Sequence, residues 1–200
     1  MCENPPVNYP HVKRLFLIAS VLGVLLTATG ANAASSKLPS DLLVTSQLPP
    51  HWRSYHVSRA DTANCVEASF RSSPTHTRVR TFFIHSSAPT QLLAEELTTT
   101  SHPIATYKRA VASVAKCSNS NASFAGYSVS QSVHAVNLGS FAVPTTAYML
   151  IASAGPVTVT SYLLFAHKHH TVMALGVAST SSVDVRAFKL LVVKAIAKID

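Results

Sequence analysis

An apolar segment near the N-terminus constrains this chain most, because it decides how much of the sequence is left to fold. The basic pair Lys13-Arg14 precedes a mostly apolar run from Leu15 to Thr27, and small residues then end in Ala31-Asn32-Ala33. A basic start, an apolar middle and a small-x-small end are typical of a secretory signal peptide, and the run is short for a bilayer span. We therefore predict a signal peptide over residues 1–33, with cleavage after Ala33 and a secreted, extracytoplasmic product.

The predicted compartment determines the expected oxidation state of the cysteines. Cleavage would remove Cys2 and leave Cys65 and Cys117, an even pair in an oxidising environment, where a disulfide is the expected state. A redox or metal-binding pair is the alternative, but the chain has no Cys-x-x-Cys spacing. Residues 34–44 contain Ala, Ser, Lys, Pro and Asp, which predicts a flexible leader and leaves residues 45–200 for a single domain.

The first half of this domain predicts a strand followed by two helices. Residues 78–85 are rich in aromatic and β-branched side chains, which favours a strand. Ser87-Ala88-Pro89 is a helix-start signal, and Leu93 and Leu97 would share a face of the helix that follows. A second helix is expected to start at Ser101. Its apolar face would consist of Ile104, Tyr107, Val111 and Val114, with Cys117 near its end.

The second half predicts an antiparallel meander closed by a helix. The expected strands cover residues 123–136, 145–153, 157–165 and 171–179. Ser181 with Asp184 three residues later resembles a capping box and predicts a C-terminal helix behind it. The buried stripe of that helix would be Val185, Phe188, Val192, Ala195 and Ile199. We therefore predict an α+β, two-layer domain: an antiparallel β-sheet packed by two central helices and a C-terminal helix, with one disulfide.

This layout resembles a known family. The chain has the run Leu48-Pro49-Pro50-His51-Trp52, the early Cys65, a helix ending in Cys117, and a Leu138-Gly139 segment before the meander. Over most of residues 45–200 it is similar to the extracytoplasmic sensor domains typified by the PknH-type receptor kinases of mycobacteria and their secreted or lipid-anchored actinobacterial relatives. The resemblance implies a ligand-binding or sensing module that carries a cleft and has no catalytic activity.

Motifs for catalysis and metal binding are missing from the sequence. It contains no Gly-x-Ser-x-Gly elbow, no His-Glu-x-x-His and no phosphate-binding glycine loop. His167, His169 and His170 could form an open metal site, but no Cys or acid lies close in sequence, and a solvated hairpin turn is the simpler interpretation. We expect no enzyme activity, no catalytic residues, no metal and no cofactor.

Arginines and aromatic residues gather in the region before the predicted helices. Arg53 lies next to Trp52 and near Tyr55, while Arg78 and Arg80 are two apart on an expected strand and therefore share a face. Guanidinium groups bind carboxylates and phosphates well, and aromatic side chains line ligand pockets. These five residues are the candidate ligand-binding site, for an anionic envelope ligand. The alternatives are a dispersed, solvated basic face for the arginines and ordinary core positions for the aromatic residues.

The expected function is a secreted, non-enzymatic ligand-binding or sensing module at the cell envelope, whose partner is a small molecule or an envelope polymer. The formal net charge of +8 suits anionic partners, but the chain has no nucleic-acid-binding motif and its compartment argues against nucleic acid. No stable membrane insertion is expected after cleavage. An apolar-ligand (lipid) carrier with a cavity between sheet and helices is the alternative, and a hydrolase with a distributed Ser/His/Asp site is a further one.

Overall fold

The computed structural model describes residues 38–54, 77–85, 91–117, 121–124 and 127–199, and the structural statements below concern these residues. The strands are β1 Trp52–Ser54, β2 Thr77–His85, β3 Gln91–Thr99, β4 Asn121–Phe124, β5 Tyr127–Val136, β6 Thr145–Ala154, β7 Val157–Lys168 and β8 Thr171–Ser179. The helices are α2 Leu38–Asp41, the 3-10 turn η2 Thr45–Gln47, α3 Pro103–Lys116 and α4 Val185–Lys198.

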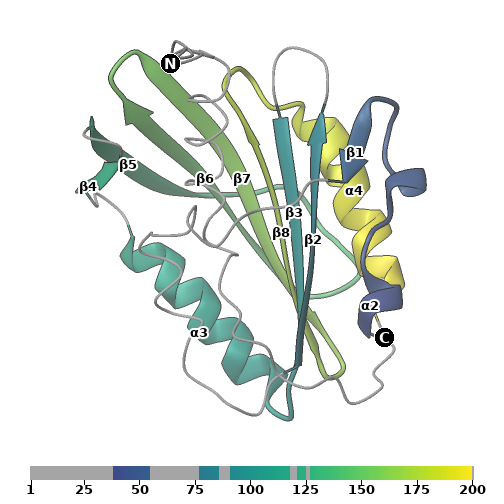
Figure 1. Cartoon of the computed structure of the whole chain (residues 1–200). Helices are drawn as coiled ribbons and strands as arrows, with labels where there is room; N and C mark the ends of the chain where they lie inside the picture. Colours follow the sequence, from purple (N-terminus) through teal and green to yellow (C-terminus); the bar gives the residue numbers. More distant parts are fainter. Residues whose placement is uncertain (1–37, 55–76, 86–90, 118–120, 125–126, 200) are drawn as a thin grey trace, which may run out of the picture.

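The strands form one antiparallel eight-stranded sheet in the order β1-β2-β3-β8-β7-β6-β5-β4 (Figure 1). The meander from β5 to β8 is the one expected from the sequence, except that the single strand predicted over residues 123–136 is two strands, β4 and β5. Residues 78–85 form most of β2 as predicted. The last strand, β8, returns beside β3 and joins the N-terminal strands to the meander. The centre of the sheet therefore combines segments about eighty residues apart, as the pairing of Leu97 with Met173 shows.

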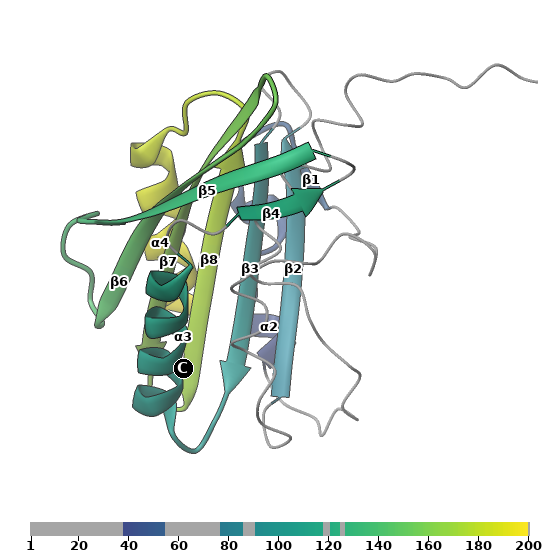
Figure 2. The same cartoon turned by 90° about the vertical axis from the view of Figure 1, so that its left-hand side faces the viewer.

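Helices cover both faces of this sheet, so the fold has three layers where the sequence predicted two. Alternate residues of β7 enter different cores: Leu163 and Phe165 pack in the cluster under α3, and Leu164 lies in the cluster under α4. Figure 2 shows α3 on the near side of the sheet and α4 on the far side. The two-layer prediction was wrong because the buried stripe of α4 meets the face opposite α3. The α+β class with an antiparallel sheet is confirmed.

The first of the two predicted central helices is wrong. Gln91–Thr99 is strand β3, in the middle of the sheet, and its residues from Leu92 to Thr98 are all buried. Because both faces of β3 are covered, its sequence has no alternation of apolar and polar residues to mark it as a strand. Leu, Ala and Glu are good helix formers, and here tertiary packing overrides that local preference. The second predicted helix is confirmed as α3.

The C-terminal helix is confirmed, with a different start. Asp184 itself is the N-cap of α4, and its side chain accepts a hydrogen bond from the backbone N–H of Ala187. The predicted capping box with Ser181 at the cap was therefore wrong by three residues. The Ser181 N–H instead donates to the Oγ of Ser179 at 3.1 Å, which ties the loop before α4 to the end of β8.

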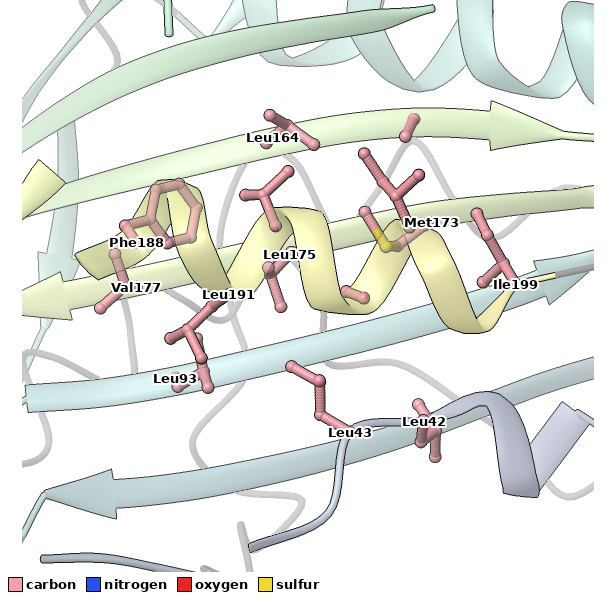
Figure 3. Packing of buried hydrophobic residues seen from close by; sticks show 14 of the residues in the cluster. Leu42, Leu43, Leu93, Leu164, Met173, Leu175, Val177, Phe188, Leu191 and Ile199 are labelled. Carbon is pink, nitrogen blue, oxygen red and sulfur yellow. The ribbon is translucent and has the colours of Figure 1, made fainter. Parts of the chain in front are cut away.

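The segment before β1 packs beside α4. Leu42 and Leu43, at the end of the segment expected to be a leader, are buried in the same core as Phe188 and Leu191 of α4 (Figure 3). Lys194 of α4 also donates a hydrogen bond to the Gln47 carbonyl oxygen at 2.8 Å. Residues 42–48 are thus an ordered part of the α4 layer.

Two further predictions concern residues that lie wholly or partly outside the described ranges. Cys117 is fully buried at the C-terminal end of α3, but Cys65 lies outside the described residues, so the disulfide stays a prediction. The signal peptide also lies outside them. Within the described ranges, no helix is long and apolar enough to cross a membrane.

Candidate binding site

A row of four residues crosses the end of the sheet where β1 begins. Trp52 pairs with His85, His85 pairs with Gln91, and Gln91 pairs with Ser179. Paired residues of an antiparallel sheet stand on the same face, so the row presents an indole, an imidazole, an amide and a hydroxyl side by side. Because Trp52 packs against the core beneath α4, this row belongs to the α4 face.

The start of α4 stands opposite this row and closes a pocket of about 170 Å³. Asp184 caps the helix and fixes where its first turn lies, and Phe188 and Leu191 then face the sheet from the next turns. The walls are mainly apolar, with polar groups from the row at one side. The pocket is lined by Pro49, Trp52, His85, Gln91, Val177, Val183, Asp184, Ala187, Phe188 and Leu191.

Ring contacts hold the mouth of the pocket together. The Trp52 and His85 rings meet edge-on with centroids 5.2 Å apart, and His51 approaches His85 in the same way at 6.0 Å. Edge-to-face pairs of this kind add a modest stabilisation beyond simple burial. His51 adopts a φ of 73°, a left-handed conformation that turns the chain sharply before β1. The His85 imidazole therefore lies in contact with both the Trp52 indole and the His51 ring.

The size and walls of the pocket decide what it can hold. Sites for drug-sized molecules usually enclose roughly 300–1,000 Å³, so this pocket accommodates one ring or a short branch of a larger molecule. Its apolar walls favour an aromatic or aliphatic group, and the Gln91 amide and the imidazole of His85 offer hydrogen bonds to a polar substituent. The carboxylate of Asp184 accepts from the Ala187 N–H, and none of the lining residues is an arginine.

The structure brings together only part of the predicted site. Trp52 lines the pocket, while Arg53 is exposed and, as the next residue of β1, points to the opposite side of the strand. Arg78 and Arg80 occupy β2 positions paired with Thr98 and Glu96, near the far end of the strand from His85. Their side chains lie outside the described part of the chain, as does Tyr55. The anionic ligand was predicted from these arginines, and it stays a prediction.

The described residues place a Ser–His contact away from the pocket. His134 and Ser132 of β5 are within hydrogen-bond distance at 3.2 Å, but both lie at the exposed surface of that strand. Among the residues that the structure describes, no group of three His, Cys, Asp or Glu side chains is close enough to hold a metal. His169 and His170 form the β7–β8 turn. His167 lies in β7, paired with Val172, and its ring packs edge-on against Tyr107 at 4.9 Å.

Sequence reasoning missed most of the pocket. His85, Gln91 and Val183 carry no motif, and they meet Trp52 only through the register of four strands and the start of α4. Phe188 and Leu191 could be expected on the buried side of a C-terminal helix, but not opposite Trp52. One feature of the sequence could have pointed to the pocket. The predicted C-terminal helix starts shortly after the last strand, and this arrangement places polar groups at the edge of the sheet.

Comparison with known proteins bears on the fold. No protein-family model matches the sequence, and a search of curated proteins found no match. The chain is similar in fold to the extracellular domain of PknH from Mycobacterium tuberculosis. That likeness has a TM-score of 0.56 at 9% sequence identity and covers 83% of this chain and 96% of that domain. LpqN, involved in cell envelope biogenesis of Mycobacterium tuberculosis, is more distant, with a TM-score of 0.33, 15% identity and coverage of 76% and 77%.

The likeness to the PknH domain confirms the fold expected from the sequence resemblance. It spans nearly the whole of that domain. At 9% identity it carries no residue-level correspondence. The likeness to LpqN is too weak to support an argument about the fold.

Proposed function

We propose that this chain is an extracytoplasmic, non-enzymatic binding and sensing module, which takes one small apolar or aromatic group of an envelope ligand into the Trp52 pocket. The observation that carries the proposal is the row Trp52–His85–Gln91 facing Phe188 across a pocket of about 170 Å³. This arrangement joins apolar walls to a few convergent polar groups, which is the usual make-up of a ligand site.

Three observations favour this function over the alternatives. The two faces of the sheet are filled by side chains of the α3 and α4 cores, which disfavours a lipid carrier with an acyl chain between sheet and helix. The pocket's acid, Asp184, is engaged as a helix cap, which disfavours a hydrolase at this position. The signal-like segment at residues 13–33 and the fold of the PknH domain support the extracytoplasmic location.

The chain carries its own probe for this pocket, because Trp52 is its single tryptophan. Two matched ligands, p-cresol and 4-methylbenzoate, present the same ring with a neutral or an anionic substituent. We expect both to change the Trp52 emission in a saturable way. Tighter binding of 4-methylbenzoate would support an anionic ligand, whereas equal binding would assign selectivity to the ring alone.

Two matched substitutions on one helix make the test specific. Ala187→Leu adds apolar volume inside the pocket and keeps a good helix former in α4, so we expect at least a roughly tenfold loss of affinity for both ligands. Ala197→Leu makes the same change at an exposed position of α4 and should leave affinity unchanged. Equal affinities of the two variants would reject the pocket as the site.

A further inference from the structure

The outward face of α4 carries exposed apolar side chains between cations. Leu190 and Val193 are 61% and 54% exposed, and Ala197 is exposed beside them. At about 100° per residue these three positions fall within an arc of about 60° on the helix. Lys189 and Lys194 lie about 40° beyond its two edges. The result is an apolar stripe about 10 Å long from residue 190 to residue 197, with a lysine on each side and Arg186 one turn before it.

The charge on this helix has one sign. From Val185 to Lys198 it contains no acid and four cations. The segment that Lys194 and Lys198 hold through hydrogen bonds to Gln47 carries another exposed apolar residue, Val44, at 49%. Of the large apolar side chains exposed in the described part of the chain, only Ile104 lies elsewhere, on α3.

A second copy of the chain is a poor partner for this face. In a two-fold contact the same patch meets itself, so the lysines beside one stripe would face those beside the other without an acid on α4 to pair with them. Like charges at an interface oppose association. The occupant must therefore bring negative charge as well as an apolar layer, and a surface of anionic lipid headgroups above acyl chains has both.

We propose that the outward face of α4 docks the protein on an anionic lipid bilayer. Leu190 and Val193 insert at the boundary between the lipid headgroups and the acyl chains, and Arg186 and Lys189 contact lipid phosphates. The contact is peripheral and reversible, since few side chains enter the bilayer. It rests on the charge and exposure of α4 and is independent of the Trp52 pocket, although the pocket opens at the first turns of the same helix.

The test uses the protein recovered after export, with its N-terminus established by mass spectrometry. It is mixed with vesicles of phosphatidylcholine alone or with about one-third phosphatidylglycerol, and the bound fraction is measured by co-sedimentation at low and high salt. Arg186→Gln with Lys189→Gln removes two cations, and Leu190→Gln with Val193→Thr removes the apolar stripe. The matched controls on α3 are Lys108→Gln with Arg109→Gln, and Ile104→Gln; all three α3 residues are exposed.

We expect binding to the anionic vesicles alone, weakened by salt. Loss of the two α4 cations should lower the partition coefficient about 25-fold, at about fivefold per cation, and loss of the stripe should lower it at least about tenfold. The α3 controls should fall by less than about twofold. Equal losses from the α3 and α4 variants, binding to phosphatidylcholine alone, or a dimer in light scattering that Leu190→Gln abolishes would overturn the proposal.

Discussion

A buried carboxylic acid in the central strand makes the stability of this fold depend on pH. Glu95 of β3 is 0% exposed on the α4 side of the sheet. Its Oε2 accepts a hydrogen bond from the backbone N–H of Leu43 at 2.6 Å. Its Oε1 has no hydrogen-bond partner within the described part of the chain. The carboxyl group therefore links the segment before β1 to the centre of the sheet.

Burial raises the pKa of Glu95 to about 7, and the Leu43 N–H and the charge of Lys198 only partly oppose that rise. The ordinary pKa of this group is 4.5, so between pH 4.5 and about 7 the folded chain holds a proton that the unfolded chain has released. Stability from this group is fully present below pH 4.5 and is lost as the pH rises through about 7. The shift corresponds to a total loss of about 3 kcal/mol.

The perturbation that isolates this effect is Glu95→Gln. The Gln side chain keeps an oxygen for the Leu43 N–H but does not titrate. In the wild type, Glu95 should lower the free energy of unfolding by about 1.4 kcal/mol per pH unit between pH 4.5 and 7. The variant should lack this fall. Leaving the Gln amide without an acceptor lowers the stability of the variant equally at every pH. The change in pH dependence, and not the absolute stability, is therefore the quantity to compare.

Urea unfolding at several values between pH 4.5 and 7.5 supplies the measurement. All other titratable groups are the same in Glu95→Gln and the wild type, so the difference between the two proteins isolates Glu95. Asp41→Asn, which removes a carboxyl group from the neighbouring helix α2, is the matched control for the loss of one acidic side chain. The same pH dependence of the free energy of unfolding in Glu95→Gln and the wild type would contradict this role of Glu95.

Three further predictions follow from single contacts. Asp184→Ala should lower the free energy of unfolding by about 1 kcal/mol through loss of the hydrogen bond to Ala187, while Asp184→Asn keeps it; equal effects on urea unfolding would contradict the cap. Ser161 is buried with no partner for its Oγ among the described residues, so Ser161→Ala should be neutral or up to about 1 kcal/mol more stable, and a clear loss would reveal a partner. Peptide mass spectrometry without reductant should recover Cys65 linked to Cys117, and reducing this bridge should cost roughly 4 kcal/mol for a loop of about 53 residues; free thiols at both would disprove it.

Local patterns in the sequence predicted the elements that are marked by periodicity or composition. The C-terminal helix shows its buried stripe at a spacing of three to four residues because its other face meets water. The β-branched and aromatic run at residues 78–85 marks β2 by composition, although Phe83 and Ile84 are buried on opposite faces. The polar and glycine-containing turns between β5 and β8 mark the meander. For these elements, local composition and tertiary position agree.

The sequence was misleading where local composition favours the wrong element or where contacts are long-range. Strand β3 is buried on both faces and is rich in Leu, Ala and Glu, so its composition indicated a helix. Glu95 and Glu96 instead stand on opposite faces of a strand. The pocket depends on the pairing of Trp52 with His85 and of Gln91 with Ser179, separations that no local pattern encodes. Trp52 was found because an aromatic residue near an arginine is itself a signal.

Chemical-shift mapping shows whether a ligand group enters the pocket between Trp52 and α4. The isotope-labelled protein is titrated with 4-methylbenzoate or p-cresol, and the shift of each amide, the single indole N–H and the side-chain amides is followed. We expect the largest changes at the Trp52 indole, the Gln91 side-chain amide and the backbone of Ala187 and Phe188. Saturable changes that centre on α3, or on β5 around His134, would contradict it.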